Sequence, residues 1–255
     1  MKKQPLPLRE VLAVAVAASD VNSFEKLGYV KAAYPVNRRI FDGTVQTVAV
    51  PEGYDGVYDG EPYVFANKDI VKEFFGHKSV TYWNSEKHHI PKLNVTEETY
   101  AKADEIIKHF QKLMFSALGG QLNDYTQLIY DIIDSGEVTP RNMGIVASMP
   151  SSFERDAVNK KHQEEIDELA HTSEYIGVVG DKIEVDIKII TSKFIEKFGC
   201  YVYNASTGEN AVTFWSQKAP EVFGETCRIK GKVKRTKVSD YTRAKETELN
   251  YVKVV

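Results

Sequence analysis

Residues 182–190 read KIEVDIKII, with apolar and charged side chains in alternation up to the final isoleucine pair. Ile183, Val185, Ile187 and Ile189 therefore share one face of an extended chain, while the charged residues share the other. This alternation is typical of a strand with one buried and one solvent-exposed face. The stretch predicts that the C-terminal third of the chain is built on β-structure.

Four more strand-like runs follow this one. Residues 194–199 and 206–208 form turns, and a connector that contains Pro220 separates the third run from the fourth. The predicted strands are 182–190, 200–204, 210–215, 226–235 and 246–254. Five strands with this break match the OB-fold, a five-stranded barrel whose second and third strands bind oligonucleotides together with the loops after strands one and four.

Several short segments resemble the OB-type nucleic-acid-binding domains of bacteriophage and plasmid proteins. They are GDKIEV at 180–185, FG at 198–199, TGEN at 207–210, IKGKVK at 229–234 and KETEL at 245–249. The resemblance implies single-stranded nucleic-acid binding, most simply of DNA, in replication, recombination or repair. It also implies a cytoplasmic location in a bacterial or phage-infected cell. Such proteins can carry a cysteine-rich zinc module near the N-terminus; this chain has no cysteine there, so no zinc site is expected.

Aromatic residues on the second and third strands are candidates for base stacking. Tyr201 and Tyr203 share one face of their strand, and Thr213 and Trp215 share one face of the next. If the smaller side chains line the core, the three rings stand outward, where each stacked base contributes about 1–3 kcal/mol. Alternatively the rings fill the core, because aromatics are common in strands and a one-residue register shift exchanges the faces.

Basic residues dominate the fourth strand and the loop after it. Arg228, Lys230, Lys232 and Lys234 alternate with smaller or apolar residues, which predicts a cationic stripe suited to phosphates. The alternative is an edge strand that uses lysines to prevent aggregation. The candidate nucleic-acid-binding residues are Tyr201, Tyr203, Trp215, Arg228, Lys230, Lys232, Lys234, Arg235, Lys237, Tyr241 and Arg243.

Charge is distributed unevenly along the 255 residues. The whole chain has a net charge of −3, yet the part from Gly177 onward carries 14 basic and 10 acidic residues. The part before Gly177 is strongly acidic by comparison. This asymmetry indicates a polyanionic partner for the C-terminal part only.

The rest of the chain predicts a separate α+β domain. Residues 8–19 indicate a buried helix, because the apolar run from Val11 to Ala18 is far shorter than the roughly 20 residues of a membrane span. Residues 43–50 alternate as in a strand, and helices are expected through the middle, about 96–171. We therefore predict a mixed domain over residues 1–172, with a boundary near Thr172, and an OB-fold domain over 173–255. No membrane partner is expected.

The sequence offers no clear catalytic, cofactor or metal site. Cys200 and Cys227 do not form a CxxC pair and are expected to be reduced, buried thiols. His88-His89, with His77 nearby, lack a carboxylate or cysteine at metal-ligand spacing. Phosphate-binding glycine motifs are absent. We therefore expect no cofactor and no enzymatic activity.

Two alternatives remain open. An OB barrel can also bind proteins, so the chain could be an adaptor that recruits replication, recombination or host factors. The chain could instead be a nucleic-acid-processing enzyme with its site in residues 20–95. Tyr82-Trp83, close to Lys78 and Lys87, either extends a nucleic-acid surface onto this region or anchors a domain interface.

Overall fold

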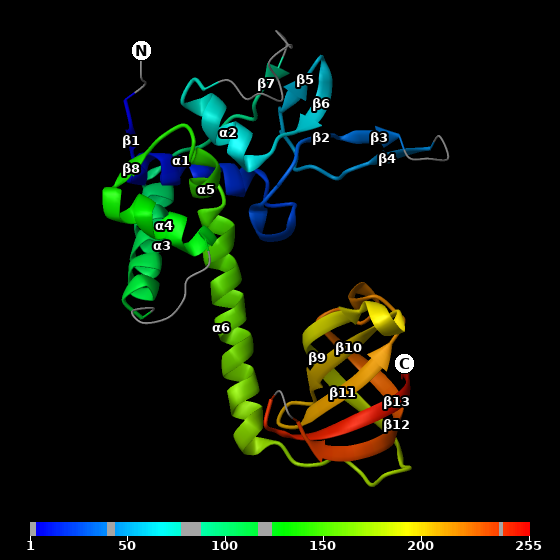
Figure 1. The fold of residues 1–255 in the computed structure, drawn as a ribbon. Helices are drawn as coiled ribbons and strands as arrows, with labels where there is room; N and C mark the ends of the chain where they lie inside the picture. The colour runs from blue at the N-terminus through cyan, green and yellow to red at the C-terminus, as the bar shows by residue number, and fades with distance from the viewer. Residues whose placement is uncertain (1–3, 40–43, 78–87, 117–123, 240–241) are drawn as a thin grey trace. The chain divides into compact units, whose positions relative to one another are not determined.

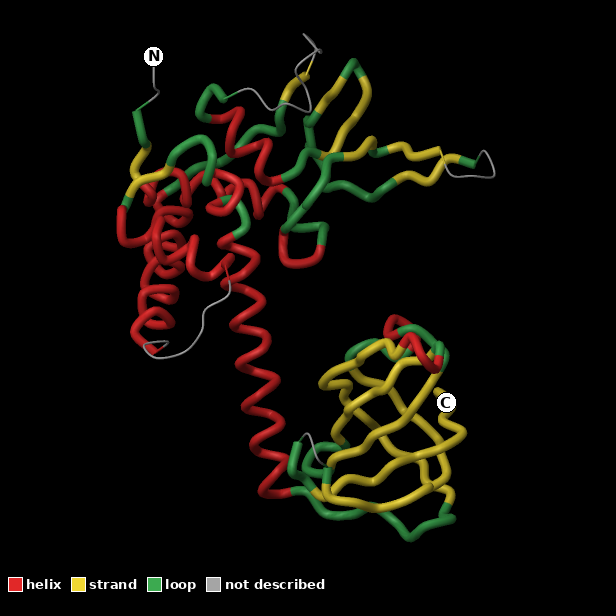
Figure 2. Tube along the Cα trace, in the orientation of Figure 1, coloured by secondary structure: helices red, strands yellow, loops and turns green. Residues whose placement is uncertain are grey.

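The computed structural model describes residues 4–39, 44–77, 88–116, 124–239 and 242–255. The chain has the predicted α+β architecture and divides into two compact units, residues 1–156 and 157–255. Helices and loops dominate the first unit, and strands dominate the second (Figure 2). Each unit has its own hydrophobic core.

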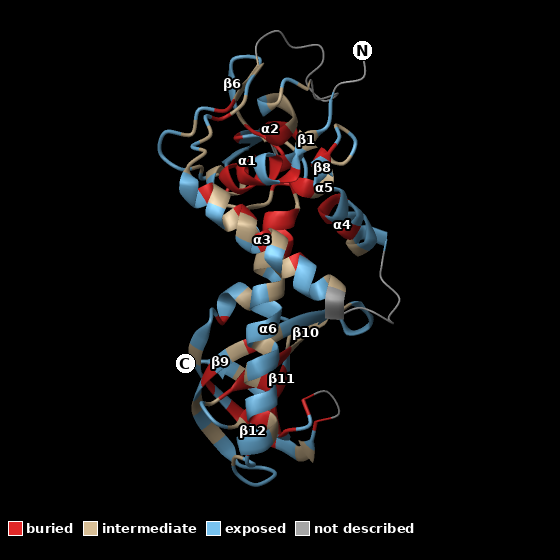
Figure 3. Ribbon diagram, turned by 90° about the vertical axis from the view of Figure 1, so that its left-hand side faces the viewer, coloured by how far each residue is buried: buried red, intermediate tan, exposed pale blue. Residues whose placement is uncertain are grey.

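Helix α1 (Leu8–Val21) lies at the centre of the first unit. Residues 11–18 are all buried, so the helix is covered around its whole circumference, as a uniformly apolar helix requires (Figure 3). This confirms the predicted N-terminal helix. The described residues also form α2 (Asn67–Phe74), α3 (Glu97–Ser116), α4 (Asp124–Ser135), α5 (Met143–Val146) and α6 (Met149–Thr172), with a short 3-10 turn η1 (Lys26–Gly28). None of the helices in the described residues is both long and apolar enough to cross a membrane.

The strands of the first unit are short. Of the strand predicted at 43–50, residues 45–47 form β4, which pairs with β3, and Gly43 lies outside the described residues. β2, β6, β5 and β7 form a four-stranded sheet in that order, and β1 pairs with β8. The bounds are β1 (Leu6–Pro7), β2 (Tyr34–Pro35), β3 (Asn37–Arg39), β4 (Val45–Thr47), β5 (Val57–Tyr58), β6 (Glu61–Val64), β7 (His88–His89) and β8 (Glu137–Val138).

The second unit contains the predicted five-stranded barrel (Figure 1). The strands close in the order β10-β11-β13-β12-β9; β11 and β13 run parallel, and the other neighbours are antiparallel. This Greek-key arrangement is the OB type. The bounds are β9 (Lys182–Ile195), β10 (Cys200–Ser206), β11 (Ala211–Ser216), β12 (Thr226–Val238) and β13 (Lys245–Val254), with 3-10 turns η3 (Glu196–Phe198) and η4 (Pro220–Val222).

The division between the units falls before the predicted boundary near Thr172. It lies inside α6, because the end of that helix packs on the barrel. Ile166 and Leu169 are buried in one cluster with Ile190, Ala211 and Ala244. The apolar residues at this end of a largely charged helix therefore belong to the barrel and not to the first unit.

Candidate nucleic-acid interface

A groove crosses the outer surface of the barrel over β10 and β11. It has a volume of about 490 Å³ and receives side chains from all five strands. We call it the barrel groove. Its lining residues are Thr191, Lys193, Val202, Asn204, Thr213, Trp215, Arg235, Lys237, Ser239, Glu246 and Glu248. The groove thus lies over the two central strands on which OB-type barrels bind oligonucleotides.

Trp215 supplies an aromatic surface in the groove, as predicted. Its side chain is 41% exposed, whereas its strand neighbour Phe214 is fully buried. Phe198, 59% exposed in the turn between β9 and β10, meets the Trp215 ring edge to face, with 5.8 Å between centroids. Lys197 lies over the Phe198 ring at 5.6 Å. Two exposed rings therefore stand together beside a cation.

The predicted outward position of Tyr203 is wrong. Tyr203 is fully buried and stacks on Phe214, with 4.9 Å between centroids and 12° between planes. The strand register explains the error: Tyr203 lies directly opposite Phe214, and Val202 lies opposite Trp215. Cross-strand partners share a face, so Tyr203 must point inward with Phe214.

Tyr201 follows Tyr203 to the inner face. It is half-buried against the barrel core and packs on Phe194, its cross-strand partner on β9, with 4.9 Å between centroids. Tyr201 does not line the barrel groove. Of the three rings proposed as a stacking surface, only Trp215 occupies the groove.

Neutral polar side chains form part of the groove floor. Asn204 donates from Nδ2 to Thr191 Oγ1 at 3.0 Å and accepts at Oδ1 from Thr213 Oγ1 at 3.3 Å. These bonds link β9, β10 and β11 across the groove and hold the Asn204 amide in one orientation. A fixed amide retains a further donor and acceptor site for a ligand.

Two buried carboxylates hold the groove cations from β12. Glu248 accepts from Lys234 Nζ and Arg235 Nε, both at 2.5 Å, and Glu246 forms an ion pair with Lys237 at 3.3 Å. Burial alone would raise the pKa of Glu248, but the hydrogen bonds from Lys234 and Arg235 outweigh it and lower the pKa below its ordinary value. Glu248 is therefore ionised at neutral pH and positions Arg235 at the groove.

We expect the Glu248 pairing to make barrel stability sensitive to acid. A carboxylate whose pKa is lower in the folded state stabilises the fold above its unfolded pKa, and that contribution is lost as the pH falls through the folded pKa. Replacing Glu248 with Gln should therefore reduce the free energy of unfolding most at pH 7. The deficit relative to the wild type should shrink as the pH falls below about 4.3.

Urea denaturation at a series of pH values measures this deficit. Glu209→Gln is the control, because Glu209 is exposed in the turn between β10 and β11. A Glu248→Gln deficit that stays constant from neutral to acid pH would contradict the inferred ionised pair.

The cationic stripe predicted on β12 is exposed but largely paired, and it lies outside the groove. Arg228 binds Asp186 through two hydrogen bonds at 2.8 and 2.6 Å, and Lys230 lies 3.8 Å from Glu184. The acidic partners stand opposite these cations on β9. The alternative of a protective edge strand is also wrong for β12, which pairs with β9 on one side and with β13 on the other.

The predicted site residues are thus separated by the fold. Trp215, Arg235 and Lys237 line the barrel groove; Lys234 contributes only through Glu248. Arg243 is exposed in the loop between β12 and β13 and has a left-handed backbone (φ 61°). Tyr241 lies outside the described residues, as do Tyr82 and Trp83. Arg228, Lys230, Lys232, Tyr201 and Tyr203 do not line the groove.

Sequence reasoning missed several residues that line the groove or pack on Trp215. Phe198 carried a usable signal, since it lies in the loop after the first strand, where OB barrels contact ligands. The predicted first strand ends at Ile190, but β9 continues to Ile195 and brings Lys193 to the groove. Glu246 and Glu248 gave no signal, because only the pairing of β12 with β13 sets them against basic residues.

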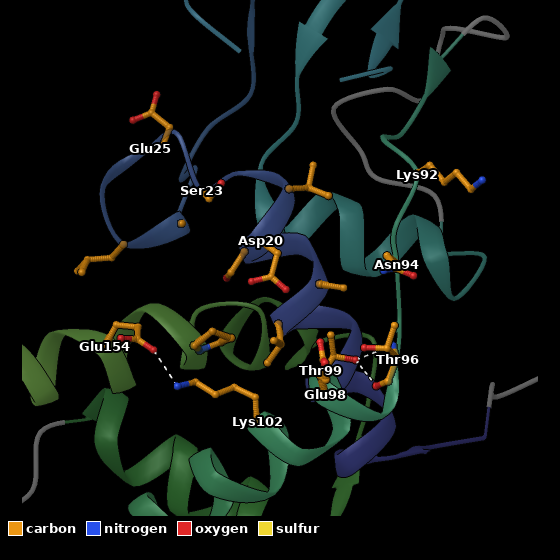
Figure 4. A pocket seen from close by; sticks show the side chains of 17 residues that line it. Asp20, Ser23, Glu25, Lys92, Asn94, Thr96, Glu98, Thr99, Lys102 and Glu154 are labelled. Carbon is orange, nitrogen blue, oxygen red and sulfur yellow. Dashed lines mark hydrogen bonds and ion pairs between the residues drawn. The ribbon is translucent and has the colours of Figure 1, made fainter. Parts of the chain in front are cut away.

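A second cavity, about 760 Å³, lies in the first unit among α1, α3 and the segment before α3 (Figure 4). Lys102 bridges to Glu154 there at 3.1 Å, and Thr99 donates to the carbonyl of Thr96. Partial burial raises the pKa of Asp20, an effect that nearby Lys102 partly offsets. Ser19 accepts from the buried amide of Asn67. These contacts connect α1 with α2 and α3 with the start of α6.

The described histidines and cysteines do not gather into one cluster. His88 and His89 pair with β5 and lie 3.5 and 3.7 Å from Glu73 and Asp55, respectively. Within the described ranges, no three His, Cys, Asp or Glu side chains are grouped as a metal site would need. Cys200 and Cys227 are free thiols and half-buried, less covered than predicted.

Comparison with protein-family models, curated proteins and solved structures gave no match to this chain. Its functional interpretation therefore depends on the geometry of the barrel and its groove.

Proposed function

We propose that the barrel binds single-stranded nucleic acid, most simply DNA, in the barrel groove and catalyses no reaction. The observation that carries this proposal is the pair of exposed rings, Trp215 and Phe198, at a groove over β10 and β11. Unpaired bases stack on such rings regardless of sequence, with about 1–3 kcal/mol for each base. Duplex bases are already stacked on one another, so stacking on the rings adds less binding free energy for a duplex than for a single strand.

The groove cations support the same ligand. Lys193, Arg235 and Lys237 reach the groove from two strands. Arg235 uses Nε for Glu248 and keeps its terminal N–H groups for a phosphate. Because Glu248 already fixes the guanidinium, less side-chain entropy is lost when a phosphate binds.

The cellular setting is part of the proposal and rests on the resemblance to phage and plasmid OB domains. We propose that the protein acts on single-stranded DNA during replication, recombination or repair in the cytoplasm of a bacterial or phage-infected cell. The first unit would then be available for replication or recombination proteins.

Fluorescence anisotropy tests the proposal. Labelled dT and rU oligomers and a duplex control are titrated with the full-length protein at about 50 to 200 mM salt. Three phosphate contacts predict a slope of log affinity against log salt near −2, which is about a 20-fold loss over this range. Single strands should bind more tightly than duplex. Absence of binding at low salt would refute the proposal and favour a protein-binding adaptor.

A further inference from the structure

An exposed tyrosine of the barrel with a strained backbone lies away from the groove. Tyr251 on β13 has φ of 56° and is 82% exposed. β12 pairs with β13 at Lys230↔Lys253 and at Lys232↔Asn250, so Gly231 alone faces both Tyr251 and Val252. This is a β-bulge, and the left-handed position of such a bulge is normally glycine.

The rest of the bulge explains why the strand bends there but not why it carries tyrosine. A side chain at Gly231 would come within 3.3 Å of Leu249 and Val252, so β12 needs glycine for close packing. Tyr251, by contrast, is exposed and does not belong to the barrel core. A left-handed non-glycine residue costs about 1–2 kcal/mol, and such strain is typically retained at functional positions.

Like-charged lysine pairs occupy the register positions on either side of this bulge. Lys182 and Lys232 lie directly opposite each other on β9 and β12, and Lys230 and Lys253 lie opposite each other on β12 and β13. All four are exposed, and like charges directly opposite each other are destabilising. Among the described residues Glu184, 3.8 Å from Lys230, is the carboxylate that forms an ion pair with this group.

Two features here each reduce stability, the strained backbone and the paired like charges, and an exposed ring stands beside them. We infer that Tyr251 with Lys182, Lys230, Lys232 and Lys253 forms a second binding surface for single-stranded nucleic acid. Tyr251 stacks on a base, and the lysines contact the adjacent phosphates. None of the five residues lines the barrel groove, so this surface takes a separate segment of the strand. The inference goes beyond the proposed groove, and only its expected result for the short oligomer rests on the groove as the tighter site.

The test compares a short dT oligomer of about 6 nucleotides with one of about 30, since one OB barrel covers roughly 4–16 nucleotides. Tyr251→Gly in the full-length protein should weaken binding of the long oligomer about 5-fold or more and leave the short one unchanged. It should also raise Tm by about 2 °C, because glycine relieves the backbone strain. Tyr251→Phe is the matched control and should keep the affinity.

The double variant Lys182→Gln/Lys232→Gln tests the surface without changing the bulge. It should lower the affinity for the long oligomer and flatten its salt dependence. Unchanged binding of the long oligomer by both this variant and Tyr251→Gly would overturn the inference. Trp215→Ala distinguishes the two sites, because it should weaken binding of the short oligomer. If Trp215→Ala has no effect while Tyr251→Gly does, the groove proposal fails and the second surface stands.

Discussion

Replacing Tyr203 with Ala should destabilise the barrel by about 3–5 kcal/mol, the range for deleting a buried aromatic side chain. Tyr203 packs against Phe214 and Phe223, whose ring centroids lie 4.9 and 4.8 Å from its own. Few side chains of comparable size fill this core. The loss is a large fraction of the 5–15 kcal/mol that holds a typical domain folded. Urea denaturation followed by circular dichroism measures it.

The tyrosine hydroxyl accounts for a small part of that loss. Burial, with Tyr201 and Glu221 nearby, raises the pKa of Tyr203 to about 12, so the hydroxyl stays protonated and donates to the Lys218 carbonyl at 2.6 Å. Tyr203→Phe should therefore cost only about 1 kcal/mol. If Tyr203→Ala kept the stability of the wild type and lost nucleic-acid affinity instead, the ring would be a binding residue after all.

The barrel was predictable from the sequence because the alternation along β9 shows which face of the strand is buried and which is exposed. Ile183, Val185 and Ile187 are apolar and their neighbours are charged, so only one face can be buried. The faces of β10 were not predictable in the same way. Tyr203 and Val202 are both common strand residues, and only the register with β11 assigns Tyr203 to the core.

The charge pattern of β12 shows a second limit of sequence reasoning. Its exposed basic residues were correctly assigned to one face, but their partners lie on strands that are distant in sequence. Asp186 on β9 pairs with Arg228, and Glu248 on β13 pairs with Lys234 and Arg235. A run of basic residues in a sequence therefore predicts that their side chains are exposed. Whether their charges are neutralised depends on the carboxylates of the neighbouring strands.

Removing both Trp215 and Phe198, the exposed ring that packs on it, should produce the largest loss of binding. The double variant Trp215→Ala/Phe198→Ala should lose about 2–4 kcal/mol, or about 30- to 1,000-fold in affinity for a dT oligomer, if each ring stacks one base. Trp215 and Phe198 are both substantially exposed, so the fold should tolerate the change. Anisotropy at low salt measures the affinity, and Tm monitors the fold.

The two single variants determine whether the rings act together. The edge of one ring meets the face of the other, so Phe198 also helps to orient Trp215. Each single loss then includes part of its partner's effect, and the two losses should sum to more than the loss of the double variant. Tyr175→Ala is a matched control, because Tyr175 is exposed to the same extent as Trp215 but does not line the groove. Equal losses in Tyr175→Ala and Trp215→Ala would show that exposed aromatics bind nucleic acid nonspecifically and that the groove has no special role.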